Sequence, residues 1–162
     1  MPSNKYPNAK YTFDTSAFIQ PWRDIYPEDI FEPIWKFVTK YIENEIIVAP
    51  FLVKKEIEKK YDELLKYIKR FPDLFKKPDE DEEEIIKKII NNPIFIKWAI
   101  RPHNEADPFV VALSKVHDLI VVTYESPSSP NKIPAACNLL NVKCVNFLGF
   151  LREEDFKIKD YI

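Results

Sequence analysis

Four carboxylate residues stand where an α/β protein could use them for chemistry: Asp14, Glu56, Asp107 and Glu125. Two of them follow apolar strand patterns, one opens a helix, and one lies two turns into a helix that follows a strand. In open parallel sheets, functional sites collect at the carboxyl ends of the strands. We therefore expect all four side chains to reach one edge of a sheet.

Carboxylates held close together repel one another, and their pKa values rise unless a cation compensates the charge. Oxygen ligands select hard ions such as Mg²⁺ and Mn²⁺, which can activate a water and bind a phosphate oxygen. The single glycine, Gly149, favours the same chemistry, because a P-loop needs two glycines and a Rossmann fingerprint needs three. The residues thus favour phosphodiester hydrolysis with one or two metal ions.

Each acid also has a structural interpretation, which the residues alone leave open. Asp14 or Ser16 could cap a short helix, and Asp107, followed by Pro108, is well suited to cap the next helix. Glu56 could be ordinary helix surface.

Two further groups of residues bear on the site. Four lysines near the acids could bind phosphates, although they could equally serve solubility: Lys54, Lys55, Lys60 and Lys132. Six consecutive acids at 79–84 suit a helix N-terminus, and we expect them to form a solvated face. We interpret His117 as a surface residue at a helix end. His103 is not expected to bind metal, because no second histidine stands at ligand spacing.

The elements that must position these residues alternate along the chain. Strands are predicted near residues 11, 47, 121 and 144, the last over 142–147. Apolar spacing of 3 and 4 predicts a helix most strongly over 53–71, ended by Pro72. Further helices are predicted at 33–42, 85–90, 94–100, 108–117 and 133–140. This alternation favours an α/β fold with a parallel sheet and helices on both faces. We expect one domain, 1–162, with a helical insert at 73–100.

Composition limits the protein class. The chain has 162 residues and a net charge of −2, but the rest of the chain carries +4 once the six acids at 79–84 are set aside. Two cysteines, Cys137 and Cys144, are too few for a disulfide framework and favour a reduced, cytoplasmic protein. No apolar run is long enough to span a membrane, and no signal peptide is recognisable. Abundant Lys, Glu and Ile favour a thermophilic source.

The order of the acids resembles that of the PIN-domain nucleases, the family that includes the VapC-type toxins. The matching segments are 11–19, 53–57, 106–113 and 121–125, and they organise the chain from residue 10 to residue 147. The resemblance implies a three-layer α/β/α domain with a mainly parallel sheet of four to five strands, the first strand central.

The resemblance also implies the chemistry. Asp14, Glu56 and Asp107 match the three principal metal-site acids of the family, and Glu125 matches a fourth position where Asp or Asn is usual. Ser16 matches a hydroxyl that supports the first Asp, and Thr123 matches the polar residue that closes the strand. The implied activity is that of a Mg²⁺- or Mn²⁺-dependent endoribonuclease, the implied partners are an antitoxin protein and a second copy of the chain, and the helical insert indicates a less characterised branch.

Alternatives of other classes remain at this point. A PIN-like module could bind RNA or protein without cutting it. A haloacid-dehalogenase-like phosphatase also has an Asp at the end of its first strand, but it would need a second Asp where Ser16 stands. A receiver domain would need paired acids and a strand-end lysine that the sequence does not place. A flap-type DNA nuclease would carry more acids.

Overall fold

The computed structural model describes residues 5–59, 62–100 and 105–162. Among these residues it contains a five-stranded sheet in the order β3-β2-β1-β4-β5, in which every pair of neighbours is parallel. The strands are β1 (Tyr11–Phe13), β2 (Ile47–Pro50), β3 (Phe75–Lys76), β4 (Ile120–Val122) and β5 (Cys144–Val145). The prediction of a parallel sheet with the first strand at its centre is confirmed.

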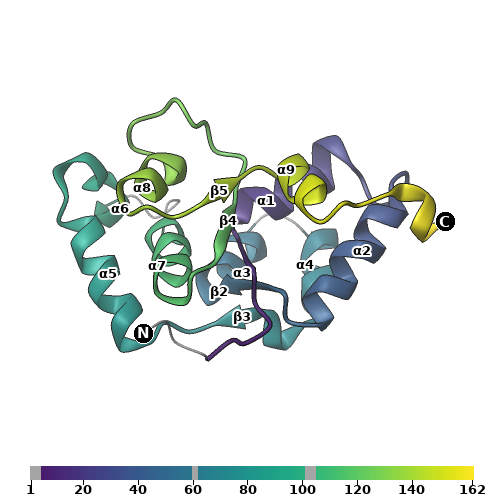
Figure 1. Cartoon of the computed structure of the whole chain (residues 1–162), viewed down its shortest axis with the longest axis horizontal. Coiled ribbons are helices and arrows are strands. Elements are labelled where there is room, and N and C mark those ends of the chain that lie inside the picture. The colour runs from purple at the N-terminus through teal and green to yellow at the C-terminus, as the bar shows by residue number, and fades with distance from the viewer. Residues whose placement is uncertain (1–4, 60–61, 101–104) are drawn as a thin grey trace.

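Helices cover both faces of this sheet (Figure 1). They are α1 (Thr15–Gln20), α2 (Glu32–Glu43), α3 (Phe51–Glu58), α4 (Asp62–Ile68), α5 (Glu80–Ile90), α6 (Lys97–Ile100), α7 (Asp107–His117), α8 (Ile133–Leu139) and α9 (Phe147–Glu153). Helix α7 packs against β1, β2 and β4, and α5 packs on the outer side of α7. Helices α2 and α9 lie on the opposite side of the sheet in Figure 1. The three layers expected from the sequence are therefore present.

The central strand is buried on both faces because helices cover both, and its one polar residue, Thr12, is buried as well. Tyr11 and Phe13 are fully buried, and Phe13 makes edge-on aromatic contacts with Phe147 and Phe150 of α9. On β4, Val121 and Val122 are equally buried. A continuous apolar run is the pattern expected of a strand covered on both faces.

Because the chain has one glycine, its left-handed turns fall on other residues. Among the described residues, φ is positive at Glu45, Asp118, Asn141 and Asp155. The first three stand between a helix and the next strand: α2 and β2, α7 and β4, α8 and β5. Asn and Asp tolerate this conformation better than most residues that have a Cβ. These turns let each helix end and the chain re-enter the sheet without glycine.

Several predicted boundaries differ from the structure. The single helix predicted over 53–71 is two helices, α3 and α4, which pack on each other. The apolar repeat continues through both helices because each of them turns its apolar face to the core. The segment 73–76 was expected to be loop within a helical insert, but it contains β3, a strand of two residues that is too short for an alternation pattern. The strand predicted over 142–147 is limited to β5, because Phe147 already begins α9.

None of the helices in the described part of the chain has the length and apolarity needed to cross a membrane.

Candidate metal centre

Asp14 directly follows the central strand and is 2% exposed. Its Oδ2 accepts hydrogen bonds from Ser16 Oγ at 2.7 Å and from Thr123 Oγ1 at 2.9 Å. Burial raises the pKa of Asp14, although the two hydroxyl hydrogen bonds act in the opposite direction. Asp14 occupies the N-cap position of α1, yet its side chain makes no capping hydrogen bond. The carboxylate is therefore held mainly by the two hydroxyls, and the backbone N–H groups of Thr15 and Ser16 at the start of α1 also favour its charged form.

Asp107 is the first residue of α7 and is 4% exposed. Ala106 occupies the N-cap position, so the sequence-based alternative that Asp107 caps this helix is wrong. The reason is local: the helix begins one residue earlier than Pro108 suggested. Asp107 Oδ2 is buried and has no hydrogen-bond partner among the described residues. Burial raises its pKa well above the usual value, and the neighbouring charges of Asp14 and Glu125 raise it further.

Glu125 reaches the same place from the loop after β4. Its Oε2 accepts a hydrogen bond at 2.7 Å from the backbone N–H of Ile133, the first residue of α8. Burial, followed by the charge of Asp14, raises its pKa. One carboxylate oxygen from each of Asp14, Asp107 and Glu125 can be chosen so that all three lie within 4.8 Å of one another. These three residues are called the acid triad below.

Glu56 of α3 lies beside the acid triad but is not one of its members. Its Oε1 accepts a hydrogen bond at 2.9 Å from the N–H of Ala106, the residue before Asp107. The pKa of Glu56 is raised to about 7, mainly because the side chain is buried. The negative charge of Asp14 raises this pKa as well. The structure thus groups three of the four predicted acids and places the fourth against the start of α7.

Ser16 and Thr123 form the support of Asp14. Their hydroxyl oxygens are 3.2 Å apart, and each also accepts from the chain after β4: Ser16 Oγ from the N–H of Tyr124, and Thr123 Oγ1 from the N–H of Glu125. These bonds tie the ends of β1 and β4 together. They fix the direction of the Asp14 carboxylate and the starting point of the loop that carries Glu125.

Among the described residues, no ion pair compensates the charge of these acids. In the part of the chain that the structure describes, Asp14, Glu56, Asp107 and Glu125 form no ion pair within 4.0 Å. Buried carboxylates without a counter-charge are costly unless they are protonated or bind a metal. An all-oxygen donor set with one unpartnered buried oxygen, Asp107 Oδ2, suits a hard divalent cation.

The predicted lysines have different surroundings. Lys54 and Lys55 lie on α3 with Glu56, and the ammonium group of Lys55 is 5.5 Å from the centre of the Phe51 ring. Lys132 precedes α8, and its positive charge offsets part of the rise in the pKa of Glu125 that burial and Asp14 cause. Lys60 lies outside the described residues, as does His103.

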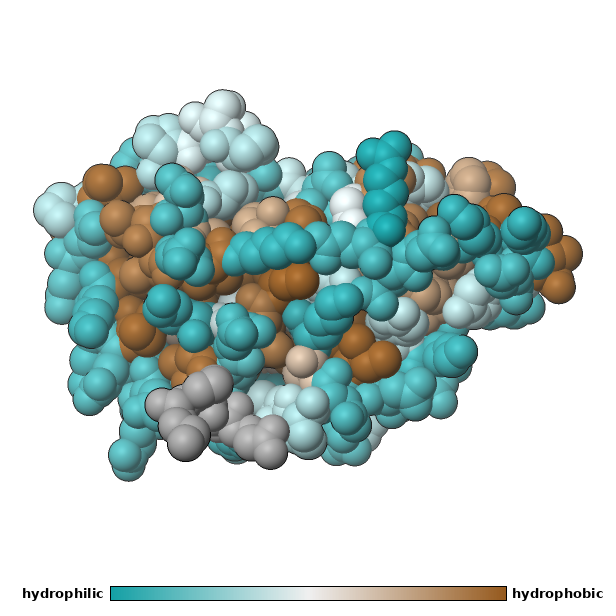
Figure 2. All heavy atoms as spheres, viewed as in Figure 1, coloured by the Kyte–Doolittle hydropathy of each residue, from teal (hydrophilic) through white to brown (hydrophobic). Residues whose placement is uncertain are grey.

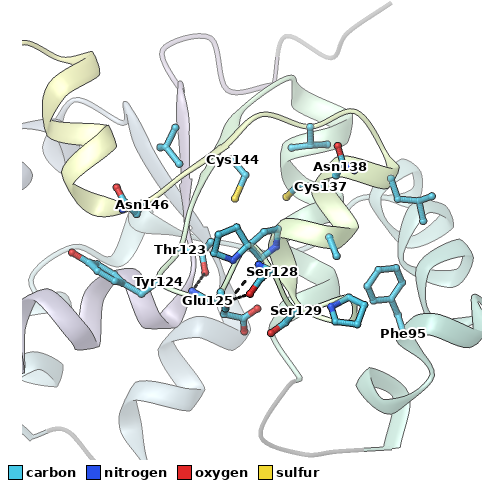
Figure 3. A pocket seen from close by; sticks show the side chains of 18 of the residues that line it. Phe95, Thr123, Tyr124, Glu125, Ser128, Ser129, Cys137, Asn138, Cys144 and Asn146 are labelled. Atoms are coloured by element: carbon cyan, nitrogen blue, oxygen red, sulfur yellow. Dashed lines mark hydrogen bonds between the residues drawn. The ribbon is translucent and has the colours of Figure 1, made fainter.

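A cleft of about 820 Å³ opens beside the acid triad (Figure 3). Thr123 and Glu125 line it on one side, and Cys137 of α8 and Cys144 of β5 line it on another. Both cysteines are free thiols. Asn146, which directly follows β5, also lines the cleft. The sequence reasoning missed Asn146 because it places this residue inside a strand over 142–147, whereas β5 ends at Val145 and the Asn146 side chain caps α9.

The fold and the sequence of this chain can be compared with those of known proteins. The fold is similar to the crystal structure of FitAcB from Neisseria gonorrhoeae, with a TM-score of 0.51 and 16% sequence identity over 85% of this chain and 98% of that chain. This likeness is one of fold, and it agrees with the three-layer α/β/α architecture described above. No curated protein matches the sequence. Residues 11–158 match the family described as "Domain of unknown function (DUF4411)". The chain therefore belongs to the DUF4411 family.

Proposed function

We propose that this chain is a Mg²⁺- or Mn²⁺-dependent endoribonuclease that hydrolyses phosphodiester bonds. The observation that carries the proposal is the acid triad: three carboxylates from three elements converge, two of them almost fully buried, without an ion pair among the described residues. The resemblance of the acids to those of PIN-domain nucleases, in residue type and in chain order, supports the choice of nuclease.

Each residue has a role in this proposal. Asp14, Asp107 and Glu125 hold the cation, and Glu56 borders the site through its bond to Ala106 N–H. Ser16 and Thr123 orient Asp14. A bound divalent ion supplies a water of lowered pKa and polarises a phosphate oxygen. The oxygen of a water molecule would form the new P–O bond, the P–O bond to the 3′ oxygen would break, and that oxygen would take up a proton, so the products would carry a 5′-phosphate and a 3′-hydroxyl.

The substrate needs a second set of contacts, and the lysines next to the acids suit it. Lys54 and Lys55 stand on the same helix as Glu56, and Lys132 stands at the start of α8 near Glu125. We assign them, with Lys60, to RNA phosphates outside the metal site. The ends of strands β1 and β4 then face the scissile phosphate, and the lysines hold the flanking backbone.

The test is cleavage of a labelled single-stranded RNA in Mg²⁺ or Mn²⁺, with and without EDTA. Asp14→Asn and Asp107→Asn are expected to lower the rate by at least about a hundredfold, because each removes a charge that the cation needs. Glu58→Gln is the matched control, since Glu58 is an exposed acid on the helix that carries Glu56. Cleavage that survives in both Asn variants, or in EDTA, contradicts the proposal.

The resemblance to VapC-type toxins extends the proposal to partners. We propose an antitoxin protein that blocks this site and a homodimer as the active form. Light scattering tests the dimer. One chain has a mass of 19.2 kDa, and the proposal expects a measured mass of twice that value. Growth arrest on expression of the chain, relieved by the Asp14→Asn variant, tests the toxin role.

The main alternative is a PIN-like module that binds RNA without cutting it. It requires no divalent ion at the acid triad, so a calorimetric titration with Mn²⁺ separates the two functions. Heat of binding that disappears in Asp14→Asn supports the nuclease, and no heat in the unmodified protein supports the module.

A further inference from the structure

A second group of potential ligands lies at the other end of α7. His117, the last residue of that helix, directs its Nε2 toward Asp79 Oδ2 at 3.1 Å and toward Glu82 Oε2 at 3.2 Å. One ligand atom from each of the three residues can be chosen so that all lie within 4.8 Å of one another. Since α7 has eleven residues, its length places this group about 15 Å from Asp107.

The histidine is what distinguishes this group from a cluster of surface acids. The His117 side chain is 1% exposed, so the prediction that it is a surface residue is wrong. The reason is that α5 covers the C-terminal end of α7 and that the Tyr6 ring packs against the imidazole at 4.9 Å. Nδ1 has no hydrogen-bond partner among the described residues, so the polar contacts of the ring there are the two carboxylate oxygens.

Backbone groups already hold the two carboxylates in place. Asp79 and Glu82 form a capping box at the start of α5: Asp79 Oδ1 accepts from the N–H of Glu82 at 2.8 Å, and Glu82 Oε2 accepts from the N–H of Asp79 at 3.1 Å. Asp79 Oδ2 is thereby left facing His117, with Lys5 Nζ at 4.0 Å. Such preorganisation by neighbouring groups is what metal ligands require.

The spacing and the donor types suit one class of ion. A tetrahedral zinc site with bonds of about 2.0–2.1 Å places neighbouring ligand atoms roughly 3.3 Å apart, close to the two distances from Nε2. An imidazole nitrogen and carboxylate oxygens are both donor types that zinc accepts, and three protein ligands leave a fourth tetrahedral position for water. Asp79 is 23% exposed, which opens that position to solvent, whereas Glu82 is 4% exposed.

The surrounding charge favours a cation. Glu80, Asp81 and Glu83 belong to the same first turn and are exposed. Figure 2 shows hydrophilic side chains along the outer edge of α5. The prediction of a wholly solvated acidic face at 79–84 is therefore wrong for Glu82, which turns inward because it pairs with the capping backbone and His117. The exposed acids raise the local concentration of cations around the two that turn inward.

We propose that Asp79, Glu82 and His117 form a second divalent-cation site, of zinc type, that joins α5 to α7 and is separate from the acid triad. The proposal does not depend on the nuclease function. Figure 1 shows the two helices side by side, so an ion at this point links the first turn of α5 to the last turn of α7. It is expected to stabilise the packing of α5 against α7.

The experiment uses the full chain with Asp14→Asn and Asp107→Asn, so that ions at the acid triad do not contribute. After equilibrium dialysis against Zn²⁺ alone, mass spectrometry of the metal content is expected to give one Zn²⁺ per chain. Adding His117→Gln is expected to weaken binding by at least about tenfold, because it removes the nitrogen ligand. Zn²⁺ is also expected to raise the melting temperature of the chain with Asp14→Asn and Asp107→Asn. It is not expected to do so when that chain also carries His117→Gln.

Two further variants keep the test decisive. Asp79→Asn retains an N-cap acceptor, so it preserves the start of α5 while it removes a charged ligand, and it is expected to weaken Zn²⁺ binding as His117→Gln does. Glu83→Gln removes a charge from the same turn without removing a ligand, and it is expected to change the affinity by less than about threefold. Absence of bound Zn²⁺, or binding that both ligand variants leave intact, overturns the proposal.

Discussion

Asp14 and Asp107 lie where water cannot solvate a carboxylate, and among the described residues hydroxyls support the first while one oxygen of the second has no hydrogen-bond partner. Asp14 has Ser16 and Thr123, whereas Asp107 Oδ2 has no partner among the described residues. Burial raises the pKa of both. The apo protein therefore carries a local cost in stability at neutral pH, and a bound cation removes it.

The pH dependence of Glu56 follows from this cost. Its pKa is about 7 in the folded protein against an ordinary value of 4.5, so the folded state binds more protons than the unfolded state between these pH values. The contribution of Glu56 to the stability of the metal-free protein therefore falls as the pH rises from about 4.5 to about 7 and stays low above that. Glu56→Gln keeps the acceptor for Ala106 N–H and is expected to raise the free energy of unfolding by about 1–2 kcal/mol at pH 8.

The measurement is urea unfolding in EDTA at pH 5 and at pH 8. The gain from Glu56→Gln is expected to be much smaller at pH 5, where the carboxyl of the folded protein is already protonated. Glu58→Gln, the exposed neighbour on α3, is expected to change stability by less than about 0.5 kcal/mol at either pH. An equal gain for Glu56→Gln at both pH values contradicts the account.

Residue types and chain order predict part of the candidate site. The end of a buried strand identified Asp14, and the start of an apolar helix identified Asp107, because both positions depend on local sequence. The partners of Glu56 and His117 could not be predicted in this way. Glu56 bonds to a backbone group 50 residues away, and His117 meets Glu82 across 35 residues. Such contacts depend on how helices pack, which no local pattern contains.

At the scale of elements, α7 connects the two groups of acids. It packs against three strands and begins with Asp107 and ends with His117. Its apolar residues Val110, Val111 and Leu113 are buried, so the helix cannot shift along the sheet without losing that packing. The position of Asp107 relative to Asp14 is thus set by the core rather than by the loop before it.

Sequence patterns predict the elements that are long or strongly apolar and fail for the short ones. The apolar run at 119–122 predicts β4 within a residue or two. The spacing of apolar residues at 108–117 predicts α7 equally well. Strand β3 has two residues, and its pairing with Ala49 and Pro50 is visible only in the folded chain. The break between α3 and α4 was missed because the apolar repeat does not change phase across it.

The whole molecule has a charge distribution that the net value hides. Of the total of −2, four negative charges belong to the candidate acids and six to the run at 79–84, so the remaining residues carry +8. A basic body around an acidic pocket can attract an RNA backbone while the pocket holds cations.

The contribution of Lys54 and Lys55 of α3 to RNA binding can be measured from the dependence of RNA affinity on salt concentration. In EDTA, which prevents cleavage, the logarithm of RNA affinity is expected to fall linearly with the logarithm of salt concentration. Lys54→Ala with Lys55→Ala is expected to reduce that slope by about 1 for each lysine that contacts a phosphate. Lys159→Ala, an exposed lysine near the C-terminus, is the control and is expected to leave the slope unchanged. Equal slopes for all proteins would assign the α3 lysines to solubility.

The central claim is that the acid triad holds a divalent cation. The most direct measurement is anomalous diffraction from crystals grown with Mn²⁺, recorded near the manganese absorption edge. We expect an anomalous peak bounded by Asp14, Asp107 and Glu125, and no peak there in crystals of Asp107→Asn. A map without a peak between these three carboxylates at millimolar Mn²⁺ would contradict it.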